Sequence, residues 1–147
     1  MKIILAAVDD SAEHSAVLEH TAKMAAQFEA LVHVVSIATP ESGWSAALGC
    51  GFAGVSQSMQ NRLRAALKQA CSELGTLGVE CTTHAAVGPV AKEIARLSAE
   101  IGADLIVIGH RNLSWLDRLL DDSVGESLLS CAPCNVLVVV NAAPHQS

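Results

Sequence analysis

The stretch that decides the fold runs from Asp104 to Val140: DLIVIGHRNLSWLDRLLDDSVGESLLSCAPCNVLVVV. Leu105 to Ile108 is a short run of apolar residues, mostly β-branched, as expected of a strand that is buried on both faces. Asn135 to Val140 is a second run of this kind. Between them, Ser123 to Glu126 has the spacing of a capping box at a helix start, and Pro133 ends that helix. The stretch therefore predicts strand, loop, helix and strand.

The connection from Gly109 to Asp122 leaves a buried strand and leads into the N-terminus of a helix. The backbone N–H groups and the dipole at a helix N-terminus favour anions, and α/β proteins commonly bind anionic ligands at such loops. We therefore expect one wall of a ligand site here.

The rest of the chain repeats the alternation of strand and helix. Strands are predicted over Lys2–Val8, Leu31–Ile37 and Val79–Val87, and helices after Ser11, over Gln57–Leu74 and over Val90–Glu100. Five strands alternating with helices predict an α/β fold, with an open parallel sheet covered by helices on both faces. Residues 1–147 read as one doubly wound domain without a linker or an internal repeat.

Three details refine this prediction. Asp10 or Ser11 can cap the first helix, and its apolar spacing is set by Ala16, Val17, His20, Met24 and Phe28. The Gln57–Leu74 helix carries an apolar face made of Met59, Leu63, Ala66, Leu67, Ala70 and Leu74. The strand Val79–Val87 is less apolar than the others and should lie towards a sheet edge, and His33 reads as a core or edge residue rather than a ligand.

The stretch from residue 38 to 58 breaks the pattern and is rich in Gly, Ser and Ala. Irregular loops of this length are usually functional or mobile. Trp44 within it has two readings: a plug at the edge of the core, or part of a lid or dimer contact. The end of the stretch, from about Gly54, can already belong to the next helix.

Composition excludes several classes of function. Apolar residues make up 51% of the chain and the formal net charge is −6, so there is no basic footprint for nucleic acid or an anionic membrane. Apolar runs such as Ile3–Val8 are far shorter than the ~20 residues that span a bilayer. The start, MKII, enters a strand without a signal-peptide pattern, and we expect a cytoplasmic protein.

Five cysteines are an odd number, and they are best read as reduced thiols in a chain without an export signal. Cys131 and Cys134 have redox or half-metal spacing, but no second such pair accompanies them. They also stand at a helix end, whereas redox pairs normally open a helix. Packing is the favoured role, and no metal site is predicted.

Fold topology suggests where a ligand would bind. In open parallel sheets the site lies beyond the carboxyl ends of the strands, where the strand order reverses. Asp9 follows the first predicted strand and Gly109 follows the fourth. If these strands are neighbours, a carboxylate suited to ribose or adenine faces a helix N-terminus suited to phosphate.

The whole chain resembles the universal stress protein family. The resemblance rests on AAVDDSAEHSAVLEHTAKMA, LVHVV, VGPVAKEIARLSAEIGADLIVIGHR and SVGESLLSCAPCNVLVVV, in the order of the family. It implies a five-stranded sheet in the order 3-2-1-4-5, similar to the adenine nucleotide alpha hydrolase fold. It also implies cytoplasmic dimers, often joined through the last strand, and in one branch ATP bound in the crevice described above.

That branch carries the motif G-x2-G-x9-G-[S/T]. Gly109 matches its first glycine and Ser123 its hydroxyl residue, followed by a fitting Val124, whereas Asn112 and Asp122 stand where the other glycines are expected. Asp9 matches the acidic residue that contacts the nucleoside, and Val34 aligns with an adenine-contacting valine. The resemblance thus implies a retained base end and an altered phosphate end.

The alteration at the phosphate end has a physical consequence. Asn tolerates the left-handed backbone better than most residues, so Asn112 is a mild change from glycine. Asp122 and its neighbour Asp121 place two carboxylates beside a helix N-terminus, where they repel a triphosphate. Weak or absent ATP binding is favoured, with retained ATP or AMP binding as the alternative. A divalent metal bridging Asp122 and phosphate would rescue it, but no independent sign of such a metal exists.

Other residues of the loop have two readings. Arg111 is either a solvated surface charge or a phosphate contact, and Ser123 is either a helix cap or a phosphate contact. His110 is either a general acid or base or the partner of a hydrogen bond across the loop. No GxxxxGK[ST] loop, GxSxG elbow or adenylyl-transfer signature is present, so we expect a binding module and no enzyme, and a nucleotide hydrolase or an adenylyl-transferring relative is the less favoured alternative.

A homodimer is expected on physical grounds as well. Asn135–Val140 predicts an apolar strand at the C-terminal edge of the sheet, with no charge to protect it. Exposed edges of this kind pair with other chains. Two-fold antiparallel pairing of this strand would close the assembly. An empty crevice in a purely structural dimer is the competing possibility.

Overall fold

A computed structural model describes residues 1–8, 14–38, 56–109 and 128–140 of the chain. The elements are β1 (Ile3–Ala7), α1 (His14–Phe28), β2 (Leu31–Ala38), α3 (Gln57–Thr76), β3 (Cys81–Val87), α4 (Val90–Ile101), β4 (Leu105–Gly109), α6 (Leu128–Cys131) and β5 (Asn135–Val139). The strands form one sheet in the order β3-β2-β1-β4-β5, and every neighbouring pair is parallel. The predicted doubly wound α/β fold and its strand order are confirmed.

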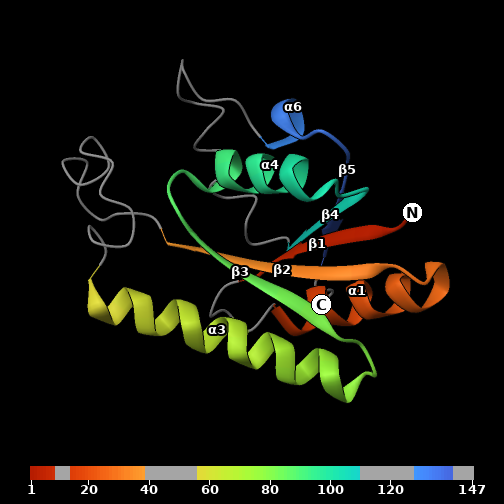
Figure 1. The fold of residues 1–147 in the computed structure, drawn as a ribbon, viewed down its shortest axis with the longest axis horizontal. Helices are drawn as coiled ribbons and strands as arrows, with labels where there is room; N and C mark the ends of the chain where they lie inside the picture. Colours follow the sequence, from red (N-terminus) through yellow and green to blue (C-terminus); the bar gives the residue numbers. More distant parts are fainter. Residues whose placement is uncertain (9–13, 39–55, 110–127, 141–147) are drawn as a thin grey trace, which may run out of the picture.

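The helices cover the two faces of the sheet in pairs. α1 and α3 lie on one face, and α4 and α6 lie on the other (Figure 1). The central strand β1 has apolar side chains on both faces of the sheet. Ile4 and Ala6 belong to the apolar cluster under α1 and α3, whereas Leu5 and Ala7 belong to the cluster under α4. All four residues are buried, as a strand in a doubly covered parallel sheet requires.

The apolar face of α3 is as predicted. Its buried residues are Leu63, Ala66, Leu67, Ala70 and Leu74, while Met59 is partly buried. The helix begins behind Ser56, whose side chain accepts a hydrogen bond from the backbone N–H of Met59.

The predicted face of α1 is partly wrong. His20 is exposed and Phe28 is 44% exposed, and the buried residues are instead Val17, Leu18, Thr21, Ala22 and Ala25. The hydroxyl of the buried Thr21 keeps a hydrogen-bond partner, because it donates to the carbonyl oxygen of Val17 at 2.7 Å. Apart from Val17 and Leu18, the buried residues of this face are small, whereas the large aromatic Phe28 at the last position of the helix is left at the surface.

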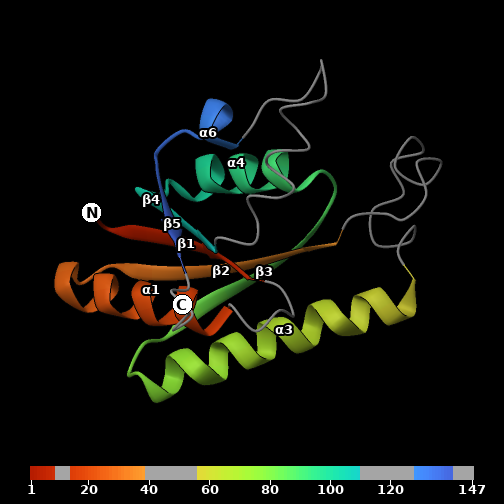
Figure 2. The same ribbon diagram turned by 180° about the vertical axis from the view of Figure 1, so that it is seen from behind.

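The sheet has two edges, β3 and β5 (Figure 2). The edge position of β3 is as predicted, and three of its residues, Thr82, Thr83 and Ala85, are exposed. β5 is the other edge and is apolar, with Val140 directly after it 61% exposed. The capping box at Ser123–Glu126, the caps at Asp10 and Ser11, and most of the 38–58 stretch with Trp44 lie outside the described residues.

Candidate functional site

The carboxyl ends of β1 and β4 lie side by side at the centre of the sheet. The two strands pair in parallel, with Ile4 opposite Leu105 and Ala6 opposite Val107. β1 is also paired with β2, which continues the sheet the other way. The strand order therefore reverses between β1 and β4, and this is the place at which open α/β sheets bind their ligands.

Residues at the ends of these two strands are held firmly. Val8 is 6% exposed, and its backbone N–H donates to the carbonyl oxygen of Val35 at 2.9 Å. Gly109 ends β4, opposite Val139 of β5, and is buried. The positions that follow in sequence, Asp9 and His110, therefore start from neighbouring, fixed points of the backbone.

The carboxyl ends of β2 and β3 lie next to that of β1, at the same end of the parallel sheet. The N–H of Gly88 donates to the carbonyl oxygen of Ala38 at 3.0 Å, and Gly88 has φ +145°. A Cβ atom at this glycine would stand 3.2 Å from Cγ of Glu93. Gly88 thus has both the backbone freedom and the small size that the turn into α4 requires.

The N-terminus of α4 is not suited to an anion. Its N-cap is Pro89, which has no N–H group, and the carboxylate of Glu93 stands in the first turn. Arg96 binds Glu93 at 2.9 Å and Glu100 at 2.7 Å, and these hydrogen bonds and charges, led by Glu93, raise the pKa of Arg96. Because the carboxylate of Glu93 already interacts with the positive end of the helix dipole, this helix N-terminus would contribute little to binding a phosphate group.

Val34 lies in the core of the molecule. Its side chain is 0% exposed and belongs to the cluster under α1 and α3, and the residue pairs with Ala6 on β1 and Thr83 on β3. A contact between Val34 and an adenine ring stays a prediction, and such a contact would have to use backbone atoms or a rearranged side chain.

The remaining predicted site residues lie outside the described part of the chain. They are Asp9, His110, Arg111, Asn112, Asp122, Ser123 and Val124. Gly109 and Val8 bound the two gaps that contain them. The structure brings Val8 and Gly109 together at the ends of the neighbouring strands β1 and β4, and the arrangement of the site residues that follow them stays a prediction.

Ser36 is a candidate that the sequence analysis missed. It is 4% exposed and lies two positions beyond Val34 on β2, towards the carboxyl end of the strand. Thr21 and Ser98, which are also buried, donate to carbonyl oxygens of their own helices. The signal for Ser36 was present in the sequence as a polar residue near the end of an apolar strand.

A polar cluster fixes the start of α1, directly after the segment that contains Asp9. Nε2 of His14 lies 2.8 Å from Oε1 of Glu73 on α3, and the hydroxyl of Ser15 donates to Oε2 of Glu73 at 3.1 Å. Gln69 adds a hydrogen bond to the same carboxylate at 3.3 Å. The two contacts from α1 join residues 58 or 59 positions apart, so no local pattern could have revealed them, whereas Gln69 and Glu73 are four positions apart on α3.

His33 forms a pair with His84 on the neighbouring strand. Their Nδ1 and Nε2 atoms are 2.8 Å apart, and the rings stack with centroids at 5.1 Å. Burial and then the charge of His84 lower the pKa of His33. His33 thus lies partly buried on β2, an inner strand of the sheet, and its partner His84 on the edge strand β3 was not predicted from the sequence.

Two general properties concern the described residues only. Within them, no group of three or more His, Cys, Asp or Glu side chains is placed to hold a metal ion. No helix among them is long and apolar enough to cross a membrane.

Comparison with known proteins finds one family that matches nearly the whole chain. The model of the universal stress protein family matches residues 1–140. A universal stress protein of Staphylococcus haemolyticus is 31% identical over 140 residues, which cover 94% of this chain and 84% of that protein.

Solved structures agree with the family match. The universal stress protein of Archaeoglobus fulgidus in complex with dAMP superposes with a TM-score of 0.68 at 23% identity, covering 95% of this chain and 97% of that one. An Arabidopsis thaliana member of the family with AMP bound gives a TM-score of 0.65 at 15% identity, covering 97% and 94%. At this identity the two structures show a shared fold.

Proposed function

Because the chain belongs to the universal stress protein family, we propose that it is a cytoplasmic, dimeric stress-response binding module with an adenine-nucleotide crevice. The crevice binds adenosine or AMP through its base and ribose end. It binds ATP weakly or not at all, because its phosphate end is altered.

The observation that carries this proposal is the pairing of β1 with β4. It brings the carboxyl ends of the two strands together at the point where the strand order reverses, and in the sequence Asp9 follows the end of β1 while Gly109 ends β4. A carboxylate at that place is suited to accept hydrogen bonds from ribose hydroxyls or an adenine amino group. Relatives of the same fold with dAMP or AMP bound support the choice of an adenine nucleotide.

Two carboxylates argue against a triphosphate. Asp121 and Asp122 precede Ser123, where the family motif has a glycine before the hydroxyl residue. Each charge pair near 4 Å costs about 1 kcal/mol in water and about 4 kcal/mol at an effective dielectric constant of 20. Micromolar binding amounts to about −8 kcal/mol, so a few such pairs are enough to abolish it. A monophosphate is shorter and carries less charge, and it is repelled less.

Isothermal titration of nucleotide-stripped protein with ATP tests this account of the phosphate end. The wild type should give little or no ATP signal, and the double variant Asp122→Gly, Asn112→Gly should bind ATP at least tenfold more tightly. Asp117→Gly removes a charge from the same loop outside the motif and serves as the matched control. Equal ATP binding by the double variant and the control would show that the motif positions do not limit affinity.

The base end needs its own test. Asp9→Asn should weaken adenosine and AMP binding by ~10-fold or more, since a hydrogen bond to a charged group contributes about 1.5–3 kcal/mol. If wild-type protein binds ATP only with Mg²⁺, and Asp122→Asn removes that binding, then Asp122 serves as a metal ligand and the proposal of a closed phosphate end fails.

We assign the chain no catalytic step. The sequence lacks a Walker loop, a nucleophile elbow and an adenylyl-transfer signature, and His110 has no second titratable residue at a motif spacing. Sustained ATP hydrolysis by purified protein, lost in His110→Ala, would overturn this assignment.

The dimer is proposed through residues Asn135 to Val140, which comprise β5 and the residue that follows it. This edge strand is apolar, and Val140 exposes 61% of its surface. Pairing of β5 with β5 of a second copy around a two-fold axis would satisfy the free backbone groups of both edges.

A further inference from the structure

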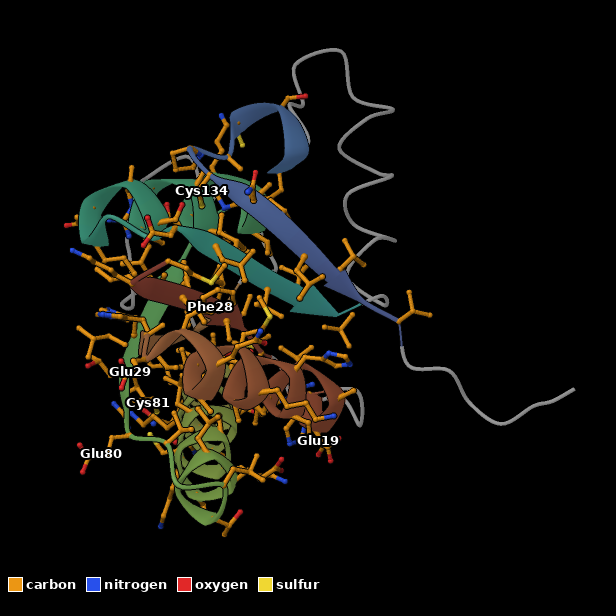
Figure 3. The ribbon with its side chains drawn as sticks, turned by 90° about the vertical axis from the view of Figure 1, so that its right-hand side faces the viewer. Glu19, Phe28, Glu29, Glu80, Cys81 and Cys134 are labelled. Carbon is orange, nitrogen blue, oxygen red and sulfur yellow. The ribbon has the colours of Figure 1, made fainter. Side chains whose placement is uncertain are left out.

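Two cysteines that are distant from the crevice face each other between α3 and β3. Sγ of Cys71 and Sγ of Cys81 are 3.0 Å apart, and both are half-buried free thiols. Cys71 lies in the last half of α3, and Cys81 is the first residue of β3. Figure 3 shows Cys81 beside Glu80, at the end of the sheet where β3 begins.

The turn between the two elements holds the sulfurs in register. Leu77 caps α3 by donating to the carbonyl oxygens of Glu73 and Leu74, and the N–H of Val79 donates to Leu74 at 2.8 Å. Gly78 adopts φ +77°, which an L side chain rarely tolerates. The chain is therefore turned back tightly, and β3 begins alongside the last turns of the helix.

Neighbouring residues of α3 and β2 hold Cys81 in place. Cys81 packs against the apolar cluster that contains Ala70 and Leu74 of α3, and it pairs with Val32 on β2. A disulfide requires sulfurs about 2.05 Å apart, so the pair needs to close by only about 1 Å.

We propose that Cys71 and Cys81 form an oxidation site, at which a peroxide converts the two thiols into an intramolecular disulfide. In the first step the Cys71 sulfur attacks hydrogen peroxide, which gives a sulfenic acid and water. In the second step the Cys81 sulfur attacks the sulfenic sulfur, the S–S bond forms, the S–O bond breaks, and the hydroxide leaves with the Cys81 proton as a second water. A dithiol reductant reverses the change.

The order of the two steps follows from the chemistry of the pair. Burial, and then the hydrogen bond and charge of Cys71, raise the pKa of Cys81 to about 12. The thiolate is the nucleophile in such reactions, so Cys81 is poorly suited to begin. Oxidation of Cys71 removes the thiol hydrogen bond and charge that help to raise this pKa, and Cys81, whose sulfur lies 3.0 Å away, is then placed to attack the oxidised sulfur.

Other cysteines in the described residues are separated from this pair. Cys131 and Cys134 pack against the cluster under α4, on the opposite face of the sheet, and Figure 3 shows Cys134 far from Cys81. Burial, with a smaller contribution from Asp104, raises the pKa of Cys134. Within one chain, Cys71 and Cys81 are therefore each other's nearest described thiol.

The sequence allows a clean test by mass spectrometry. Residues 69–92 contain no internal Lys or Arg, so both cysteines fall in one tryptic peptide, and Glu73 and Glu80 allow a glutamate-specific protease to separate them. Reduced, full-length protein is treated with increasing hydrogen peroxide, alkylated, and digested with both proteases. We expect a disulfide-linked pair of fragments that dithiothreitol releases.

Variants make the result specific. Cys131→Ser should leave the cross-link intact, whereas Cys71→Ser should abolish it and leave Cys81 open to alkylation. Phenylarsine oxide, which binds two adjacent thiols with loss of water, provides a second measurement on reduced protein: it should protect both cysteines from alkylation in the wild type and not in Cys71→Ser or Cys81→Ala. Folding of each variant is checked by circular dichroism.

Two outcomes would overturn the proposal. One is recovery of Cys71 and Cys81 as separately alkylated or separately over-oxidised fragments at peroxide concentrations that consume thiols elsewhere in the chain. The other is a cross-link that joins Cys81 to a cysteine other than Cys71.

Discussion

Two glycines near helix ends have opposite roles. Gly102 caps α4 with φ +70°, a left-handed conformation that costs other residues about 1 kcal/mol. Gly75 lies within α3, and a Cβ atom there would meet no heavy atom within 4 Å. We expect Gly102→Ala to destabilise the protein by ~1 kcal/mol and Gly75→Ala to stabilise it by ~0.5–1 kcal/mol in urea unfolding. If both substitutions stabilised the protein, or both destabilised it, this account would be contradicted.

The histidine pair makes stability depend on pH. The pKa of His33 is lowered below its ordinary value of 6.5, so the unfolded chain binds a proton more readily than the folded one. The stabilising contribution is therefore complete above pH 6.5 and is lost as the pH falls from there towards the folded pKa. Because the side chain is half-buried, we expect an effect of under about 1 kcal/mol.

Urea unfolding at pH 7.5 and pH 5.5 measures this effect. His33→Gln should lose less stability on acidification than the wild type, and His20→Gln, a substitution of an exposed histidine on α1, should behave as the wild type does. A wild type and a His33→Gln variant with the same pH dependence would show that the pair does not control it.

At the scale of elements, the Glu73 cluster joins two helices that are far apart in sequence. Glu73 receives hydrogen bonds from Ser15 and Gln69 and contacts His14. We expect Glu73→Ala to cost about 1–2 kcal/mol, because three polar groups lose a charged partner in a half-buried place. Glu100→Ala removes an exposed carboxylate that is 2.7 Å from Arg96, and should cost under about 0.5 kcal/mol. Chemical denaturation compares the two, and an equal cost would contradict the assigned role.

Helix and strand positions were largely predictable, because period-2 and period-3.6 patterns are local. The apolar face of α3 and the edge position of β3 followed from such patterns. The buried face of α1 did not follow from the pattern. The predicted apolar face included Phe28, whereas Thr21 and small residues are among those that are buried. Contacts such as His33 with His84, His14 with Glu73, and Cys71 with Cys81 depend on the register of separate elements, and only the structure reveals them.

At the scale of the whole molecule, the candidate site was predictable only in its location. Alternating strands and helices place a crevice at a reversal of strand order, and the pairing of β1 with β4 confirms where that reversal lies. Whether Val34 meets a ligand was not predictable, because full burial is expected of any residue in a strand that is covered on both faces.

The proposed dimer can be tested at the same scale. Val140→Lys places a charge beside the apolar edge of β5, on a side chain that is 61% exposed. We expect this variant to weaken dimerisation by at least tenfold in sedimentation equilibrium. Leu77→Lys, at a 48% exposed position in the turn after α3, should leave the dimer unchanged. A wild type that is monomeric at micromolar concentration would refute the interface.

The central claim, a crevice with an intact base end and a closed phosphate end, is tested most directly by the ratio of two affinities. Isothermal titration of wild-type, nucleotide-stripped protein compares AMP with ATP, each with and without Mg²⁺. We predict that AMP binds at least tenfold more tightly than ATP, and that Mg²⁺ does not reverse the order. ATP binding at micromolar concentration, equal to or tighter than that of AMP, would contradict the claim.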